Sequence, residues 1–289
     1  MLKGLLIFSL LVRCGAACAA LQVQDDEGRS LTLPAPALRI VSLAPGATAM
    51  LFAAGAGARV VGTAEYSDEP EAARRIPRVG DSQGFDTERI LNLHPDVVVA
   101  WSQGTSEAQI EKLERLGLRV YRHRINRLDE LPPALRRLAH LTATEAVAEP
   151  LARSLELQLS VLRQAHQKDP APSVLIQVWD QPLFTVGDQQ LLSDALAACG
   201  YRNLYADLGA AAGAIGLESV LARGPQLIVA VAPDAGAAAE WLKRWRQYPS
   251  LPAVASGRLV PVIDQRFSRM GPSTIAATAD LCAQLDGGS

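Results

Sequence analysis

The sequence is poor in several features that would place it in a well-known class of protein. Only 5% of its 289 residues are aromatic, four are cysteine, and the 28 Lys and Arg residues are outnumbered by 30 Asp and Glu residues. Nucleic acids and anionic membranes attract concentrated positive charge, so this balance argues against both as partners. The composition, 49% apolar and 20% charged, is that of a globular protein with one large domain or two ordinary ones.

The sequence also lacks short motifs of common enzyme families, such as a Gly-Lys-Ser/Thr phosphate loop or a His-Glu-x-x-His zinc site. Its four histidines, His94, His123, His140 and His166, do not have the spacing of metal ligands. We therefore expect no catalytic residues and no metal site. His123 lies between two arginines beyond a predicted strand, and we weigh it as a ligand contact against a solvated polar turn.

The first twenty residues have the pattern of a secretory signal peptide. Lys3 precedes an apolar stretch, residues 5–12, and small residues follow up to position 20. This stretch is too short to span a bilayer. We predict a signal peptide over residues 1–20 and a soluble periplasmic protein, in preference to one with a lipid anchor at Cys18.

Removal of this signal peptide would leave two cysteines, Cys199 and Cys282. In an oxidising compartment such a pair is most simply a disulfide, and two buried thiols are the alternative. A disulfide that closes a loop of roughly 80 residues would stabilise the fold by about 4 kcal/mol in the chain-entropy model.

The rest of the chain consists of two halves with a similar pattern. In each half, short apolar segments of strand type alternate with helical segments, which is the order of a parallel sheet covered by helices on both faces. Residues 88–99, ERILNLHPDVVV, resemble residues 218–229, ESVLARGPQLIV. We predict an α/β fold with two lobes, each with a central, mostly parallel sheet.

A long helical segment, residues 142–168, separates the two halves. Its apolar residues recur every three or four positions, so one face should be buried, and Pro150 should disturb it. We interpret the segment as one rigid helix that bridges the lobes, with a core helix inside a single domain as the alternative. The predicted lobes are then residues 21–141 and 169–289.

Aromatic and polar residues follow several predicted strands, at the edge where parallel α/β sheets bind ligands. Two such lobes joined by a helix leave a cleft, and flat aromatic side chains suit a large ligand held by stacking. The helical spacing of Trp241 and Trp245 predicts packing roles instead. The predicted ligand-binding residues are Tyr66, Trp101, Trp179, Phe184, Asp264, Gln265, Arg266, Phe267, Ser268 and Arg269.

Glu88 and Glu218 open equivalent predicted helices in the two halves. The helix dipole stabilises a carboxylate there by about 0.3–1 kcal/mol, which is enough to explain either residue alone. Their matching positions also suit a protein that docks on a two-fold symmetric partner through one acidic residue per lobe.

These segments together resemble a known family. Residues 39–45 (RIVSLAP), 61–68 (VGTAEYSD) and 88–101, with the long helix, are similar to the periplasmic solute-binding proteins of ABC importers for cobalamin and ferric siderophores, and most of all to the cobalamin branch. The resemblance implies a monomer that captures cobalamin or a close corrinoid between its lobes, has no resident cofactor and delivers the ligand to an inner-membrane permease dimer.

The resemblance also assigns residues. It implies ligand contacts for Tyr66, Trp101 and residues 264–269, a disulfide between Cys199 and Cys282, and permease docking through Glu88 and Glu218.

The chain departs from the family pattern at Ala49, where a Glu is usual, and at residues 209–216, which are small where the cobalamin branch has a bulky aromatic. A ferric-siderophore or haem binder of the same fold is the first alternative. A tetrapyrrole-handling enzyme that uses His123 as acid or base is the second. Five residues could hold an anionic ligand in the first alternative: Arg122, His123, Arg124, Arg266 and Arg269.

Overall fold

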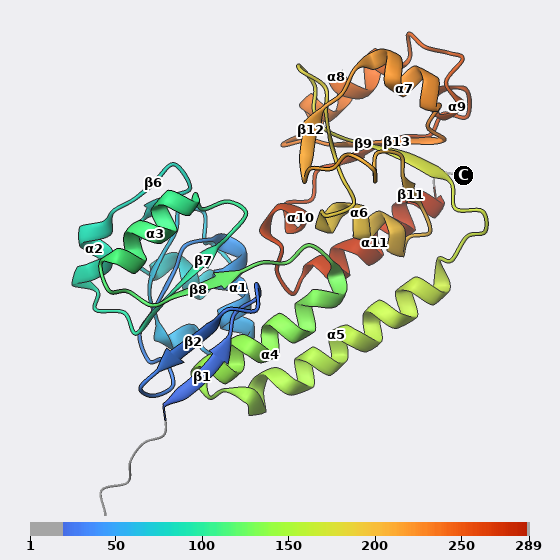
Figure 1. The fold of residues 1–289 in the computed structure, drawn as a ribbon. Helices are drawn as coiled ribbons and strands as arrows, with labels where there is room; N and C mark the ends of the chain where they lie inside the picture. Colours follow the sequence, from blue (N-terminus) through green and yellow to red (C-terminus); the bar gives the residue numbers. More distant parts are fainter. Residues whose placement is uncertain (1–19, 288–289) are drawn as a thin grey trace, which may run out of the picture.

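The computed structural model describes residues 20–287, which fold into two lobes, each built on its own sheet (Figure 1). Cys18 and all but the last residue of the predicted signal peptide lie outside this range. Among the helices of the described residues, none has the length and apolar character that a bilayer crossing requires.

The N-terminal lobe contains a four-stranded parallel sheet with helices on both faces. Val97 and Val99 join one apolar core, whereas Val98 and Ala100, which point to the opposite face, join another. The strands lie in the order β4 (Val60–Thr63), β3 (Ile40–Ser42), β7 (Val97–Trp101) and β8 (Val120–His123). The helices are α1 (Pro45–Ala53), α2 (Thr87–Asn92) and α3 (Glu107–Arg115), with 3-10 turns η1 (Gly57–Arg59) and η2 (Glu71–Arg75).

Two antiparallel hairpins complete this lobe. The first pairs β1 (Leu21–Gln24) with β2 (Ser30–Leu33) and turns at residues 25–29. The second pairs β5 (Gly80–Asp81) with β6 (Gly84–Phe85).

The C-terminal lobe contains a six-stranded, mostly parallel sheet, so the predicted fold class is confirmed. Its parallel strands are β11 (Arg202–Asn203), β9 (Ser173–Trp179), β13 (Leu227–Val231) and β14 (Leu259–Val262). The antiparallel strands β10 (Phe184–Val186) and β12 (Ala212–Ala214) extend it, so part of residues 209–216 forms an edge strand. The helices are α6 (Leu191–Ala198), α7 (Leu217–Arg223), α8 (Ala235–Trp245), α9 (Pro252–Ala255), α10 (Arg266–Arg269) and α11 (Thr274–Gly287).

Two predictions on single side chains are also confirmed in this lobe. Trp241 and Trp245 are buried between α8 and the sheet. Cys199 and Cys282 form a disulfide, which ties the end of α6 to α11, and the alternative of two free thiols is wrong.

The connection between the lobes differs from the prediction. α5 (Glu145–Ala165) is three residues shorter at each end than the predicted helix, and it continues through Pro150. A second helix that the sequence analysis did not identify, α4 (Leu131–Thr142), precedes it and lies antiparallel beside it (Figure 1). The left-handed backbone of Ala143, with φ of 47°, separates the two helices. A helical hairpin therefore bridges the lobes, while the division of the chain into domains stays a prediction.

The hairpin is held by an apolar core that extends through both lobes. This core includes the inner faces of the two sheets, Leu135 and Leu138 of α4, and Leu155 and Leu159 of α5. Because interiors are close-packed, rotating one lobe against the other would require this core to repack.

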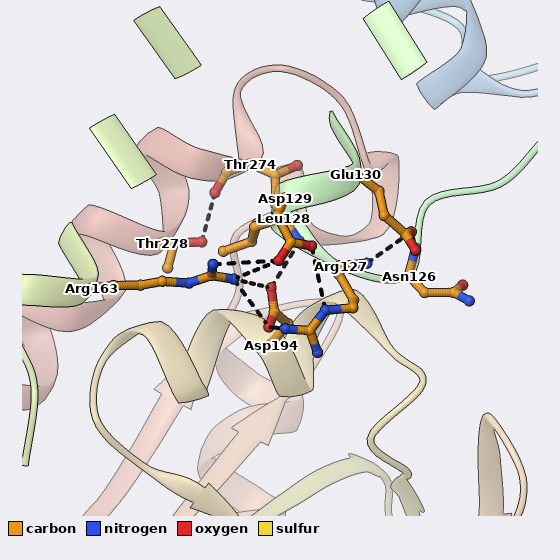
Figure 2. Close-up of polar contacts among 9 residues, drawn as sticks. All are labelled: Asn126, Arg127, Leu128, Asp129, Glu130, Arg163, Asp194, Thr274 and Thr278. Atoms are coloured by element: carbon orange, nitrogen blue, oxygen red, sulfur yellow. Dashed lines mark hydrogen bonds and ion pairs between the residues drawn. The ribbon is translucent and has the colours of Figure 1, made fainter. Parts of the chain in front are cut away.

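A buried carboxylate adds a polar connection at the C-terminal end of the hairpin (Figure 2). Asp194 of α6 is 4% exposed and accepts a hydrogen bond of 2.8 Å from the Leu128 backbone nitrogen, in η3 (Leu128–Glu130). It pairs with Arg127 at 2.9 Å and with Arg163 of α5 at 3.1 Å. Arg127 and Arg163 also reach the exposed Asp129 at 3.4 Å each. These five residues, the Asp194 cluster, join three segments far apart in sequence.

We predict that Asp194→Asn lowers the free energy of unfolding by about 2 kcal/mol, because it weakens two ion pairs at a buried site and can leave a buried backbone N–H poorly satisfied. Urea denaturation followed by circular dichroism measures the loss. The matched control is Asp129→Asn in the same cluster, which should change stability by less than about 0.5 kcal/mol because Asp129 is exposed. Equal losses for the two variants would contradict this role of Asp194.

Candidate ligand-binding site

The strand ends of the two lobes meet around a small cavity. One side comes from the start of α1 after β3 and from the last residues of β7 and β8, and the other comes from α10 after β14. The cavity holds about 40 Å³, room for only a few water molecules. It is lined by Ala44, Pro45, Gly46, Ala47, Trp101, His123, Ile125, Ser268, Arg269 and Met270.

The lobes touch where α10 meets α1. A Cβ atom at Gly46 would lie 1.8 Å from the Arg269 carbonyl oxygen, so this contact requires glycine. Arg269 also forms an ion pair with Glu69 of the opposite lobe. Ala49, one of the departures from the family pattern, lies at the same contact. A Cβ atom added to Gly271 would be 3.3 Å from the Cβ atom of Ala49. A large ligand can therefore enter the cavity between the lobes only if α10 moves away from α1.

Aromatic side chains are available on both sides of this contact. Tyr66, after β4, is 74% exposed and has a left-handed backbone with φ of 62°. Trp101, at the end of β7, is partly buried because its ring lies against Gly104. Trp179, at the end of β9, is 56% exposed and meets Trp241 edge-on, with 6.2 Å between ring centroids. Exposed rings at facing strand ends provide flat apolar area for a bulky ligand.

A larger pocket lies beside the cavity, at the carboxyl ends of β9, β13 and β14. It holds about 410 Å³, and it is lined by the predicted ligand residues Trp179, Asp264, Gln265, Phe267 and Ser268 together with Val178, Val231, Ala232, Pro233, Val262 and Ile263. The structure thus brings most of the predicted C-terminal residues together. Phe184 lines neither this pocket nor the cavity: it pairs with Trp179 from β10.

The charged residues of α10 are already paired with protein groups. Arg266 donates from Nε to Asp264 at 2.8 Å and from Nη2 to Asp280 at 2.6 Å. The hydrogen bond from Arg266 lowers the pKa of the Asp264 carboxyl. Arg269 is paired with Glu69, as described above. Neither arginine offers uncompensated positive charge to a ligand.

His123 is not in a solvated turn, so that expectation is wrong. The side chain is 3% exposed, and its Nδ1 lies 2.6 Å from Oδ2 of Asp26, in the turn of the first hairpin. Asp26 also accepts hydrogen bonds of 2.7 Å from Tyr121 Oη and from Arg137 Nε. Burial raises the pKa of Asp26, but the hydrogen bond from His123, the charge that His123 carries when protonated at low pH and the charge of Arg137 together lower it to about 2. Periodicity did not reveal this pair because 97 residues separate its members.

Residues 80–84, Gly-Asp-Ser-Gln-Gly, fit the Gly-x-Ser-x-Gly pattern of a hydrolase nucleophile elbow, so the expectation that the sequence lacks the short motifs of common enzyme families is wrong here. The elbow requires a sharp turn from a strand into a helix. Here the residues form the β5–β6 hairpin, with Ser82 exposed in its turn. Within residues 20–287 there is also no group of three or more His, Cys, Asp or Glu that could hold a metal ion.

Glu88 and Glu218 lie in the first turns of α2 and α7, and both are exposed. Among the described residues, neither carboxylate forms an ion pair. The two lobes therefore each present one free acidic side chain on equivalent helices.

Comparison with known proteins agrees with this architecture. A family model described as a periplasmic binding protein matches residues 40–264. The vitamin B12-binding protein of Pectobacterium carotovorum subsp. carotovorum (strain PC1) is 32% identical over 86% of this chain and 88% of its own length. That of Yersinia pestis (strain Pestoides F) is 31% identical over 88% of this chain and 89% of its own length.

Solved structures show the same relationship. The periplasmic vitamin B12-binding protein of Vibrio cholerae matches with a TM-score of 0.77 and 30% identity, over 88% of this chain and 98% of that one. A periplasmic heme-binding protein of Roseiflexus sp. RS-1 has a TM-score of 0.72 at 24% identity, over 87% of this chain and 99% of that one. At that identity the second match shows the shared fold alone.

The Asp26 pair predicts a specific acid sensitivity. The pKa of Asp26 falls from 3.8 to about 2 on folding, so ionised Asp26 stabilises the fold above about pH 4, and this stabilisation is lost as the pH falls toward 2. The shift corresponds to roughly 2 kcal/mol. Urea denaturation at stepped pH should show the stability difference between the wild type and Asp26→Asn shrinking by about that amount from pH 5 to pH 2. A difference that stays constant over this range would contradict the prediction.

Proposed function

This chain belongs to the periplasmic binding protein family, a family of solute-binding proteins rather than enzymes, and from that premise we propose that it captures cobalamin or a close corrinoid in the periplasm. The observation that carries the proposal is the pair of exposed aromatic rings, Tyr66 and Trp179, on facing strand ends of a chain about one third identical to vitamin B12-binding proteins. A corrin is broad and nearly flat, so rings on either side can stack on it.

The charges around the cleft support a corrinoid over an anionic siderophore or haem. Corrinoids of the cobalamin type carry mainly carboxamides at their edge, whereas many siderophores and haem carry negative charges. Two of the cationic residues that could favour an anion are paired with carboxylates of their own lobe: Arg266 with Asp264 and Asp280, and Arg122 with Glu107 by a bidentate contact in which the Nη1 distance is 2.7 Å. Burying an anion there would require the protein to break its own ion pairs.

In the proposed complex, the ligand lies between the lobes with α10 displaced from α1. Tyr66 and Trp101 contact it from one lobe, and Trp179 contacts it from the other, supported by Phe184. Asp264, Gln265, Ser268 and Arg269 provide polar contacts, while Arg266 and Phe267 hold the loop in place. The opening should be small, because a continuous helix such as α5 bends only by weakening backbone hydrogen bonds. The chain acts as a monomer, performs no chemistry and needs no cofactor.

Delivery is proposed to occur at an inner-membrane ABC permease dimer. Glu88 and Glu218, one in each lobe, would enter basic sockets on the two permease subunits and fix the orientation of docking.

We predict that the mature protein binds cyanocobalamin with one-to-one stoichiometry in a calorimetric titration. Trp179→Ala should weaken binding about tenfold, because it removes an exposed stacking surface worth on the order of 1 kcal/mol. Leu157→Ala on α5, where an apolar side chain is similarly exposed outside the site, is the control and should leave the affinity unchanged.

Haem and a ferric hydroxamate siderophore are titrated in parallel. Binding of either one without binding of cyanocobalamin would contradict the corrinoid proposal and support the first alternative.

We predict that Glu88→Ala and Glu218→Ala leave cyanocobalamin affinity unchanged but each reduce ligand transport through the reconstituted permease, with about a tenfold loss in the double variant because docking loses both acidic contacts. Vesicle uptake of labelled cobalamin measures this loss. Glu111→Ala and Glu240→Ala remove exposed carboxylates elsewhere on the two lobes and serve as controls. Normal uptake by the double variant would exclude this docking mode.

A further inference from the structure

We propose that His123, oriented by Asp26, accepts a hydrogen bond from a primary carboxamide of the ligand at the floor of the inter-lobe cavity, with Trp101 donating to the same amide group. The inference rests on the proposed function and deepens it, because it assigns a part of the ligand to a part of the site. It makes the intact amide edge of a corrinoid a requirement for tight binding.

The hydrogen bonds of Asp26 determine which ring nitrogen of His123 carries the proton. The Asp26 carboxylate receives the Tyr121 hydroxyl, the Arg137 guanidinium and the Arg124 backbone N–H, the last at 3.0 Å, in addition to the imidazole. An ionised carboxylate can only accept. The proton of a neutral His123 must therefore be on Nδ1, at 2.6 Å from Asp26, which leaves a lone pair on Nε2.

The second ring nitrogen is available to a ligand. His123 lines the inter-lobe cavity, and within residues 20–287 no hydrogen bond reaches its Nε2. The buried carboxylate also limits rotation of the ring, so the acceptor is presented in a fixed direction.

Trp101 supplies the complementary group. Trp101 and His123 are register partners on the parallel strands β7 and β8, so their side chains leave the same face of the sheet from strands about 4.8 Å apart. The indole Nε1 is buried and has no hydrogen-bond partner among the described residues. An indole N–H can only donate, and a buried donor without a partner costs about 1–3 kcal/mol. Trp101 lines the same cavity as His123, so we expect opening of the lobes to bring this N–H within reach of a ligand.

One acceptor and one donor side by side match a primary carboxamide, which has N–H groups to donate and a carbonyl to accept. A carboxylate has no proton for Nε2 and would bring a negative charge toward Asp26. Arg137, the cation next to Asp26, does not offset this charge, because it is already bound to Asp26. The pair thus favours a corrinoid with intact amides over haem or over corrinoid acids.

The test uses cyanocobalamin and its monocarboxylic acids, in each of which one primary amide is hydrolysed to a carboxylate. Calorimetry on the wild type should show at least one isomer binding about tenfold more weakly than cyanocobalamin, the effect of losing one hydrogen bond at a buried acceptor. His123→Leu should bind cyanocobalamin more weakly and should no longer distinguish that isomer. His123→Gln, whose carbonyl oxygen can accept, should keep part of the discrimination.

His140→Leu on the exposed face of α4 is the matched control and should behave as the wild type. Thermal unfolding of each variant reports whether it folds. If His123→Leu does not fold, the inference is tested by the discrimination of His123→Gln and by the affinities of the wild type for cyanocobalamin and its monocarboxylic acids. Equal affinity of the wild type for all isomers, or unchanged discrimination in the His123 variants, would overturn the inference while cobalamin binding stands. Failure of the wild type to bind cyanocobalamin would instead overturn the proposed function.

Discussion

The packing of both sheets on one helical hairpin is the constraint on which the rest of the structure depends. The inner faces of the two sheets and the buried faces of α4 and α5 form one apolar core, so the lobes share an interior instead of being joined by a linker. Such a core fixes the direction in which each sheet presents its strand ends. The strand ends therefore face each other around the cavity between the lobes.

Two buried carboxylates also hold distant segments together, one at the bridge between the lobes and the other in the N-terminal lobe. Asp194 connects α6, α5 and the segment before α4, and Asp26 connects the first hairpin to β8 and α4. Each satisfies several donors from segments far apart in sequence, which makes an ion tolerable in a buried position. One of them stabilises the bridge between the lobes, and the other positions the imidazole at the cavity floor.

At the closed contact between α1 and α10, the arginine side chains are paired with carboxylates. Arg266 and Arg269 are bound to carboxylates of the chain itself, and the rings of Tyr66 and Trp179 are exposed. In the proposed complex, a ligand that displaces α10 from α1 would meet these rings and would separate Arg269 from Glu69.

The sequence by itself predicted two α/β lobes, a long helix between them and a disulfide between Cys199 and Cys282, because apolar periodicity can be read along the chain and removal of the signal peptide would leave this one pair of cysteines. It did not reveal α4, which begins with Leu131 and two prolines that are tolerated in a first helical turn but read as a break. Only the tertiary structure decided that His123 is buried on Asp26, that Asp194 joins three segments, and that α10 closes against α1. These features depend on which distant residues meet when the sheets pack on the hairpin, and no local pattern encodes that choice.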